Sequence, residues 1–142
     1  MVSKNGKVVL ITGGNKGLGK EIGRQLGALG YTVVLTARDE KAGKQAAAEL
    51  VAAGCDAHTV GLEVTRPDDI ARVASDLETT FGKLDVLVNN AGIAIEWDGQ
   101  PTNADKIRRT LEVNLIAPYA ITEALVPLLS RSDDARVINH SS

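Results

Sequence analysis

The stretch Ile11-Thr12-Gly13-Gly14-Asn15-Lys16-Gly17-Leu18-Gly19 follows the apolar run Val8-Val9-Leu10-Ile11 and opens a helix-like run. Glycines at a turn from strand to helix let the backbone approach a phosphate, because no Cβ stands in the way. The helix behind such a turn presents unpaired N–H groups and the positive end of its dipole to an anion. The spacing Gly13-x-x-x-Gly17-x-Gly19 differs from the commoner G-x-G-x-x-G, so the turn alone leaves both a nucleotide site and plain turn glycines open.

Short apolar runs alternate with helical periodicity along the rest of the chain. We expect strands at 8–12, 31–37, 56–63, 84–89 and 136–140, and helices at 16–30, 39–53, 66–81 and 104–129. Strands that alternate with helices form βαβ units with parallel strands and right-handed crossovers. The pattern predicts the α/β class with a parallel sheet. We expect a Rossmann-type doubly wound sheet of five strands in the order 3-2-1-4-5, with helices on both faces. We interpret residues 1–142 as a single dinucleotide-binding domain.

Apolar residues at helical spacing predict which side of each helix faces the core. These residues are Leu18, Ile22, Leu26 and Leu29 in the first helix, Ile70, Val73, Leu77 and Phe81 in the third, and Ile107, Leu111, Leu115 and Ile121 in the long one. Pro118 is expected to kink the long helix and Pro127 to shorten it. The last strand, 136–140, is expected to be an exposed edge that invites pairing.

The composition excludes several classes of function. With 44% hydrophobic and 24% charged residues, the 142-residue chain has the balance of a soluble globular protein. Its net charge of −2 creates no strong field toward nucleic acid or a membrane. We expect no signal peptide and no apolar run long enough to span a bilayer. The single cysteine, Cys55, favours a reducing, cytoplasmic location and a packed rather than a nucleophilic thiol.

Metal chemistry is not expected either. His58 and His140 lie far apart, and no Cys/His spacing typical of a metal site is present. The pair Asp68-Asp69 is interpreted as the start of a helix, where acidic side chains stabilise the dipole, and not as a catalytic pair.

Three motifs occur in the order seen in the classical short-chain dehydrogenases/reductases: Thr12-Gly13-x-x-x-Gly17-x-Gly19, Asn89-Asn90-Ala91-Gly92 and Val137-Ile138-Asn139-His140-Ser141-Ser142. The glycine turn and the stretch 84–94 resemble especially the carbonyl reductase branch, and the resemblance spans the whole chain. It implies an NADPH-dependent oxidoreductase that reduces a ketone or aldehyde by hydride transfer, with a small-molecule carbonyl or alcohol as partner. Association in this family usually involves the long fourth helix, which leaves a homo-oligomer open.

The resemblance also implies a set of cofactor-binding residues. Thr12 would help to hold the glycine turn, the glycines would line the pyrophosphate, and Asn90 would lie near the adenosine ribose. Glu63 stands where the family usually has an Asp that accepts a hydrogen bond from the adenine amino group, and it is one methylene longer. The expected set is Thr12, Gly13, Asn15, Lys16, Gly17, Leu18, Gly19, Arg38, Glu63, Val64, Asn90, Ala91 and Gly92.

The end of the second strand favours NADP(H) over NAD(H). A carboxylate there would bind the free 2′-hydroxyl and repel a 2′-phosphate, and the similar NAD-dependent enzymes carry that acid where this chain has Ala37. Lys16 and Arg38 stand where NADP-preferring relatives carry basic residues, and a charge-assisted hydrogen bond contributes roughly 1.5–3 kcal/mol. Asp39 lies at the sequence distance of an NAD-type acid, but we interpret it as the N-cap of the next helix.

The resemblance implies catalytic roles for Asn114 and Ser142. Asn114 would hold a water in the family's proton relay, and the Ser142 hydroxyl would bind the substrate carbonyl oxygen as charge develops there. The family's Tyr-x-x-x-Lys pair is not found, because neither Tyr31 nor Tyr119 has a lysine four residues later. General acid catalysis contributes about 10²–10⁴-fold, so we expect the N-terminal, cofactor-binding portion of a reductase that is inactive alone. The alternative is a non-catalytic NADP-binding module or sensor. A methyltransferase-type nucleotide fold is a third hypothesis, and the motif Asn89-Asn90-Ala91-Gly92 argues against it.

Overall fold

The computed structural model describes residues 4–93 and 99–140. Its strands are β1 (Val8–Ile11), β2 (Thr32–Ala37), β3 (Asp56–Gly61), β4 (Val86–Asn89) and β5 (Arg136–Asn139). Its helices are α1 (Gly17–Ala28), α2 (Glu40–Ala52), α3 (Pro67–Thr80), α4 (Ala104–Leu111) and α5 (Ala117–Leu129), with the π-helical turn η2 (Glu112–Ile116) joining the last two.

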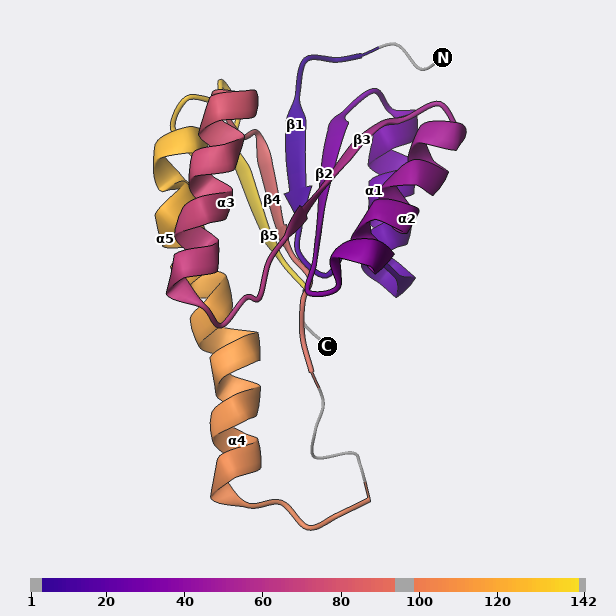
Figure 1. Ribbon diagram of the computed structural model, residues 1–142. Coiled ribbons are helices and arrows are strands. Elements are labelled where there is room, and N and C mark those ends of the chain that lie inside the picture. The colour runs from indigo at the N-terminus through magenta and orange to yellow at the C-terminus, as the bar shows by residue number, and fades with distance from the viewer. Residues whose placement is uncertain (1–3, 94–98, 141–142) are drawn as a thin grey trace.

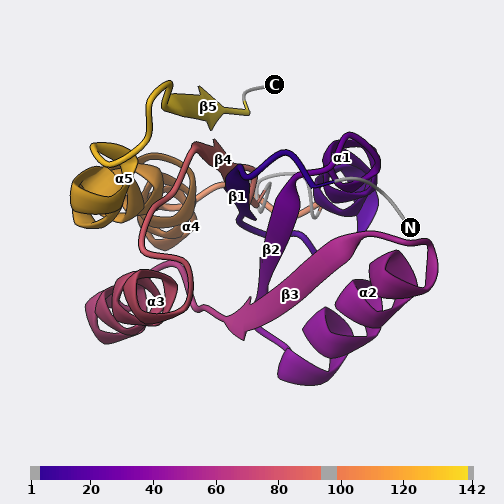
Figure 2. The same ribbon diagram turned by 90° about the horizontal axis from the view of Figure 1, so that it is seen from above.

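The five strands form one parallel sheet in the order β3-β2-β1-β4-β5, which confirms the predicted class and strand order. β1 lies at the centre, where Val9 is paired with Val33 of β2 on one side and with Val86 of β4 on the other. Helices α1 and α2 cover one face of the sheet, and α3 and α5 cover the other (Figures 1 and 2). The carboxyl ends of all strands therefore meet at one edge, from which α4 projects away.

The central strands form the floor of two apolar cores. All four residues of β1 and all four of β4 are buried, as expected for parallel strands with helices on both sides. Alternate residues face opposite helical layers: Leu10 and Leu87 pack toward α3 and α5, whereas Val9 and Ile11 pack toward the side of α1 and α2.

Helix α1 packs through its glycines, so the prediction that Leu18 and Leu29 face the core is wrong. Leu18 is 52% exposed and Leu29 68% exposed, while Gly19, Gly23 and Gly27 are the buried residues of the helix. A Cβ on Gly27 would lie 2.7 Å from the Sγ atom of the buried Cys55, which leaves no room for a side chain. The small residues let the helix axis come close to the sheet, and this turns the leucines at the flanks toward solvent.

The long helix also departs from the prediction in its first half. Ile107, Leu111 and Leu115 are 50%, 46% and 63% exposed, whereas Ile121 is buried as predicted. The turn η2 changes the helical register, and α4 lies beyond the carboxyl edge of the sheet, where the described residues offer no layer to pack against (Figure 1). Pro118 is the second residue of α5 and, without an N–H, cannot bond the carbonyl four residues earlier.

The same region departs from the expectation that no apolar run could span a bilayer. By length and composition, the 26-residue helix Ala104–Leu129 could cross a membrane, because an 18-residue window of it has a mean hydropathy of 1.2. Core helices of soluble proteins pass the same test, and α5 contributes Ile121, Leu125 and Leu128 to the core. Pro127 lies inside α5 without shortening it, since the helix continues to Leu129.

The remaining elements follow the predictions closely. Asp39 caps α2, because its Oδ1 accepts hydrogen bonds from the backbone N–H groups of Lys41 and Ala42. In α3 the predicted residues Ile70, Val73 and Leu77 are buried, and the Asp68-Asp69 pair lies in the first turn. Every residue of β5 is exposed, so this strand forms an open edge of the described sheet.

Candidate functional site

Two cavities lie side by side at the carboxyl edge of the sheet. The first has a volume of about 740 Å³ and the second about 810 Å³. They share one wall, formed by residues 90–93 directly after β4. Ten of the thirteen predicted cofactor residues line the first cavity: Gly13, Asn15, Lys16, Gly17, Arg38, Glu63, Val64, Asn90, Ala91 and Gly92.

The glycine turn between β1 and α1 forms one side of the first cavity. Gly13 and Gly17 have φ values of 61° and 57°, in the left-handed region that side chains disfavour. No side chain caps α1 at Lys16, so the N–H groups of its first turn remain available to a ligand. The turn therefore has the conformation that an anion-binding loop requires.

Three of the predicted cofactor residues, Thr12, Gly19 and Leu18, do not line the first cavity. Thr12 is 1% exposed, and its Oγ1 accepts hydrogen bonds from the N–H groups of Asn90 and Ala91, both at 3.0 Å. A Cβ on Gly19 would lie 2.5 Å from both the Gly13 carbonyl oxygen and the Asn90 Nδ2. These two residues thus support the cavity wall from behind, whereas Leu18 lines the second cavity.

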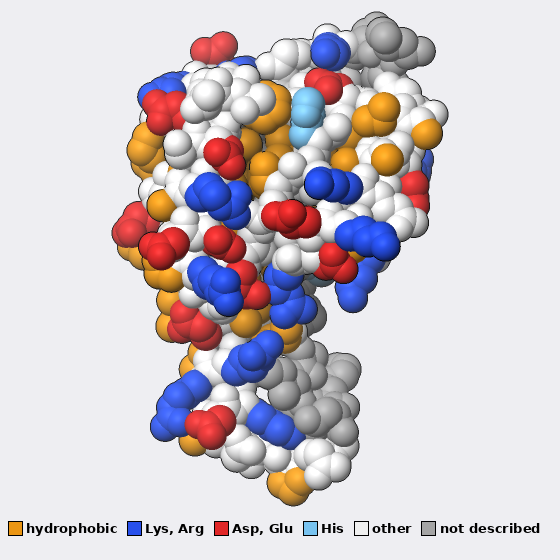
Figure 3. All heavy atoms as spheres, viewed as in Figure 1, with side chains coloured by type: hydrophobic (Ala, Val, Ile, Leu, Met, Phe, Trp, Pro, Cys, Tyr) orange, Lys and Arg blue, Asp and Glu red, His pale blue; other side chains and the backbone are white. Residues whose placement is uncertain are grey.

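Four basic side chains line the first cavity: Lys16, Arg38, Arg66 and Arg109. None of the four has an ion pair or a side-chain hydrogen bond with any residue in the described ranges. Elsewhere on the surface, cations such as Lys20, Arg24 and Arg131 do pair with glutamates. Figure 3 shows acidic and basic side chains interspersed over the face in view, whereas the first cavity gathers four cations that lack such partners.

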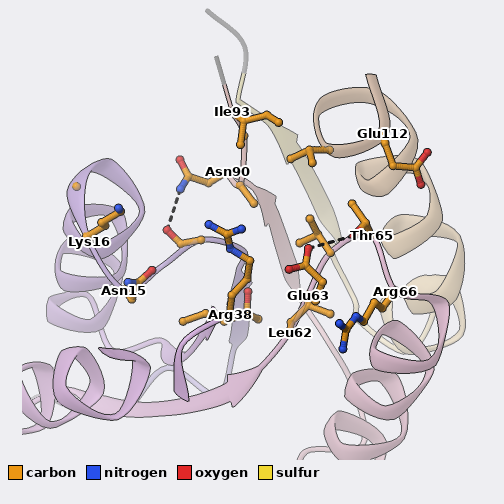
Figure 4. Close-up of a pocket in the computed structure, with 18 of the residues that line it drawn as sticks. Asn15, Lys16, Arg38, Leu62, Glu63, Thr65, Arg66, Asn90, Ile93 and Glu112 are labelled. Carbon is orange, nitrogen blue, oxygen red and sulfur yellow. Dashed lines mark hydrogen bonds between the residues drawn. The ribbon is translucent and has the colours of Figure 1, made fainter. Parts of the chain in front are cut away.

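The cavity also carries two carboxylates, Glu63 and Glu112. Figure 4 shows Asn15 and Lys16 on one side, Glu63 and Arg66 on the other, and Arg38 between them. The hydroxyl of Thr65 donates to Glu63 Oε1 at 3.1 Å and so orients that carboxylate.

The backbone of the loop after β3 is held by Asp69 in the first turn of α3. The N–H of Glu63 donates to Asp69 Oδ2 at 2.9 Å, and this hydrogen bond holds the pKa of Asp69 below its usual value. This hydrogen bond therefore anchors the loop that presents Glu63 and Arg66 to the first turn of α3.

Sequence reasoning missed Thr65, Arg66, Arg109 and Glu112. Thr65 and Arg66 directly follow the predicted Glu63-Val64, so the rule that ligands bind at the carboxyl ends of parallel strands could have included them. No local signal marks Arg109 and Glu112, because the path of α4 past the sheet edge brings them to the cavity.

The second cavity has a different chemistry. Its described lining contains no Asp, Glu, Lys or Arg side chain and includes Leu18, Asn89, Asn90, Ala91, Gly92, Ile93, Asn114, Leu115, Pro118, Tyr119, Thr122, Val137, Asn139 and His140. The side chain of Asn114 in η2 binds the backbone of Ile93, accepting from its N–H at 2.9 Å and donating to its carbonyl at 2.7 Å. Its predicted role in holding a water stays a prediction, and Ser142 lies outside the described residues.

Asn89 ties the end of β4 to its neighbours. It is 4% exposed, and its Nδ2 donates to Thr122 Oγ1 of α5 at 3.2 Å and to Asn139 Oδ1 of β5 at 2.8 Å. Its Oδ1 has no hydrogen-bond partner among the described residues, which leaves a buried acceptor beside the second cavity.

Comparisons with known proteins agree with this geometry. The family model described as short chain dehydrogenase matches residues 7–142. The chain is 38% identical to "Short-chain dehydrogenase/reductase 1" of Saponaria officinalis, covering 96% of this chain and 53% of the relative. It is also 38% identical to "Carbonyl reductase [NADPH] 3" of Rattus norvegicus, covering 99% of this chain and 50% of the relative. The chain thus spans about half the length of these relatives.

Among solved structures, the chain is similar to a metagenomic short-chain oxidoreductase in complex with NADP. The TM-score is 0.87 at 38% sequence identity, covering 96% of this chain and 62% of that one. The two backbones therefore follow similar paths over 96% of this chain, beyond the shared strand order.

Proposed function

The chain belongs to the short-chain dehydrogenase/reductase family, and from that premise we propose that it binds NADP(H) in preference to NAD(H) and serves the reduction of a ketone or aldehyde. The names of two relatives support this, since one is a carbonyl reductase with NADPH and the other is solved with NADP. When bound, the cofactor would supply the hydride. The residues of this chain would bind and orient it.

The unpaired cations Lys16 and Arg38 carry the proposal. They line the same cavity as Ala37, the residue at the end of β2, where an acid would repel a 2′-phosphate. Asp39, the nearest acid in the sequence, is used as the cap of α2 and does not line the cavity. A phosphate on the adenosine ribose would meet two cations that no described carboxylate neutralises.

The other parts of the cofactor fit the remaining lining. The glycine turn and the uncapped start of α1 suit the pyrophosphate. Glu63, oriented by Thr65, can accept a hydrogen bond from the adenine amino group. The uncharged lining of the second cavity suits a neutral nicotinamide ring and the carbonyl compound that would accept the hydride.

Calorimetric titration of the chain with NADPH and with NADH tests the cofactor preference. We expect NADPH to bind at least about tenfold more tightly. Lys16→Ala and Arg38→Ala should each weaken NADPH binding by roughly 10- to 100-fold, the loss of one charge-assisted contact, and leave NADH binding nearly unchanged. Lys41→Ala is the matched control, because Lys41 is an exposed lysine on α2 outside the cavity. Equal affinities for the two cofactors would overturn the preference, and no binding of either would overturn the proposal.

NADPH oxidation with a panel of ketones and aldehydes tests the reaction itself. The alternative is a module that binds NADP without turnover. Tight NADPH binding with no oxidation by any panel member would favour the binding module over the reductase.

A further inference from the structure

His140 stands at the end of β5 and lines the second cavity. Its Nδ1 lies 3.2 Å from Asn90 Oδ1, and Asn90 Nδ2 donates to the Gly13 carbonyl at 3.2 Å. These three residues follow the neighbouring strands β5, β4 and β1. A chain of hydrogen bonds therefore crosses the carboxyl edge of the sheet, from the second cavity to the glycine turn of the first.

The direction of these hydrogen bonds determines the tautomer of His140. The Gly13 carbonyl can only accept, so the Asn90 amide must present its NH₂ group there and its oxygen to the imidazole ring. Only a protonated Nδ1 can complete that contact. The neutral ring therefore carries its hydrogen on Nδ1 and leaves a lone pair on Nε2.

The described surroundings of His140 carry no Asp, Glu, Lys or Arg side chain. β4, α1 and α5 contribute Asn89, Leu18 and Tyr119 to the same cavity, and the described lining includes no charged side chain. The His140 backbone N–H donates to the Asn89 carbonyl at 3.1 Å, which holds the residue in place. The other histidine, His58, lies on β3 and is paired with Asp56.

We propose that His140 is a positioning residue that connects the two cavities: its Nδ1–H orients the Asn90 amide and, through that amide, the Gly13 carbonyl of the glycine turn.

The test needs no cofactor. The chain has two histidines, so His58→Asn leaves His140 as the one ring observed in a long-range ¹H–¹⁵N spectrum of the labelled chain. We expect the Nδ1–H tautomer at neutral pH, and an Asn90→Leu change should shift the ring toward the Nε2–H form preferred in water. An Nε2–H ring in the chain with Asn90 intact would overturn the positioning role, whether or not NADPH binds.

Discussion

At the amino end of the sheet, the carboxylate of Asp85 accepts hydrogen bonds from the Val8 N–H at 2.8 Å and the Ser132 hydroxyl at 2.6 Å, and it pairs with Lys83 at 3.0 Å. At the carboxyl end, the four cations of the first cavity have no such partner among the described residues. The sheet thus has a fully partnered carboxylate, Asp85, at its amino end and four cations without such partners at its carboxyl end.

This difference distinguishes charged side chains that stabilise the fold from charged side chains that remain available to a ligand. Asp85 is 4% exposed and joins β1, the start of β4 and the segment before β5, so its contacts contribute to the free energy of unfolding. Unpaired cations near one another contribute nothing to that free energy and repel slightly. Functional sites commonly break the rules that the rest of a fold obeys, and the carboxyl end does so here.

Gly19→Ala should have the largest effect, because it alters the shared wall of both cavities. The new Cβ would stand 2.5 Å from the Gly13 carbonyl oxygen and from Asn90 Nδ2, so the glycine turn must shift. A displacement of about 1 Å at a site costs roughly 100-fold in binding or rate, and overpacking costs about 1–3 kcal/mol of stability. Titration with NADPH and a urea melt would measure the two effects.

The matched control for that change is Gly61→Ala at the end of β3. Its new Cβ would lie 3.2 Å from Glu40 Oε1, the far end of a flexible side chain that can move away. NADPH affinity within about twofold of wild type is expected there. Equal losses of NADPH affinity in the two alanine variants would show that replacing any glycine weakens binding, and that the crowding at the glycine turn is not the cause.

Asp85→Ala should lower the free energy of unfolding by about 2–4 kcal/mol, because it leaves the Val8 N–H without its acceptor and removes the partner of Lys83. NADPH affinity of the folded variant should be unchanged. Asp134→Ala is the control, since its exposed pair with Arg136 contributes at most about 1 kcal/mol. Urea melts of both variants, each with an NADPH titration, check this. A clear loss of affinity in Asp85→Ala would contradict the separation of the two ends.

The contribution of Asp85 to the free energy of unfolding should also depend on pH. Burial opposes its ionisation, but the hydrogen bonds from Ser132, Val8 and Lys83 hold the pKa of Asp85 below its usual value. A lowered pKa in the folded state means stability that is present above the unfolded value of about 3.9 and lost as the pH falls through the folded value. The melting curves of wild type and Asp85→Asn should therefore converge in acid.

The smallest effect is expected from Lys16→Ala and Arg38→Ala on stability. Because neither cation has an ion pair with a described residue, removing it should change the free energy of unfolding by less than about 0.5 kcal/mol. Thermal melts without cofactor would measure this. If either variant loses more than about 1 kcal/mol of unfolding free energy, these cations stabilise the fold as Asp85 does. The contrast between the two ends of the sheet would then be wrong.

Parts of the site could be predicted because their signals are local. The glycine turn, Asp39 as a cap and Ala37 at the end of β2 each follow from residues within a few positions of one another. The exposed leucines of α1 could not be predicted in this way. Their spacing marks one face of the helix, but the close approach through Gly23 and Gly27 decided which face lies against the sheet.

The sequence by itself determined the alternation of strands and helices, the parallel sheet, the position of the phosphate-type turn and the two cations expected at a 2′-phosphate. Only the tertiary structure decided that Arg66 and Arg109 join those cations, that the first half of the long helix has no described layer to pack against, and that His140 meets Asn90 fifty residues away. The physical reason is that periodicity reports which side chains share a face. What lies opposite that face depends on strand order and register, which bring distant segments together.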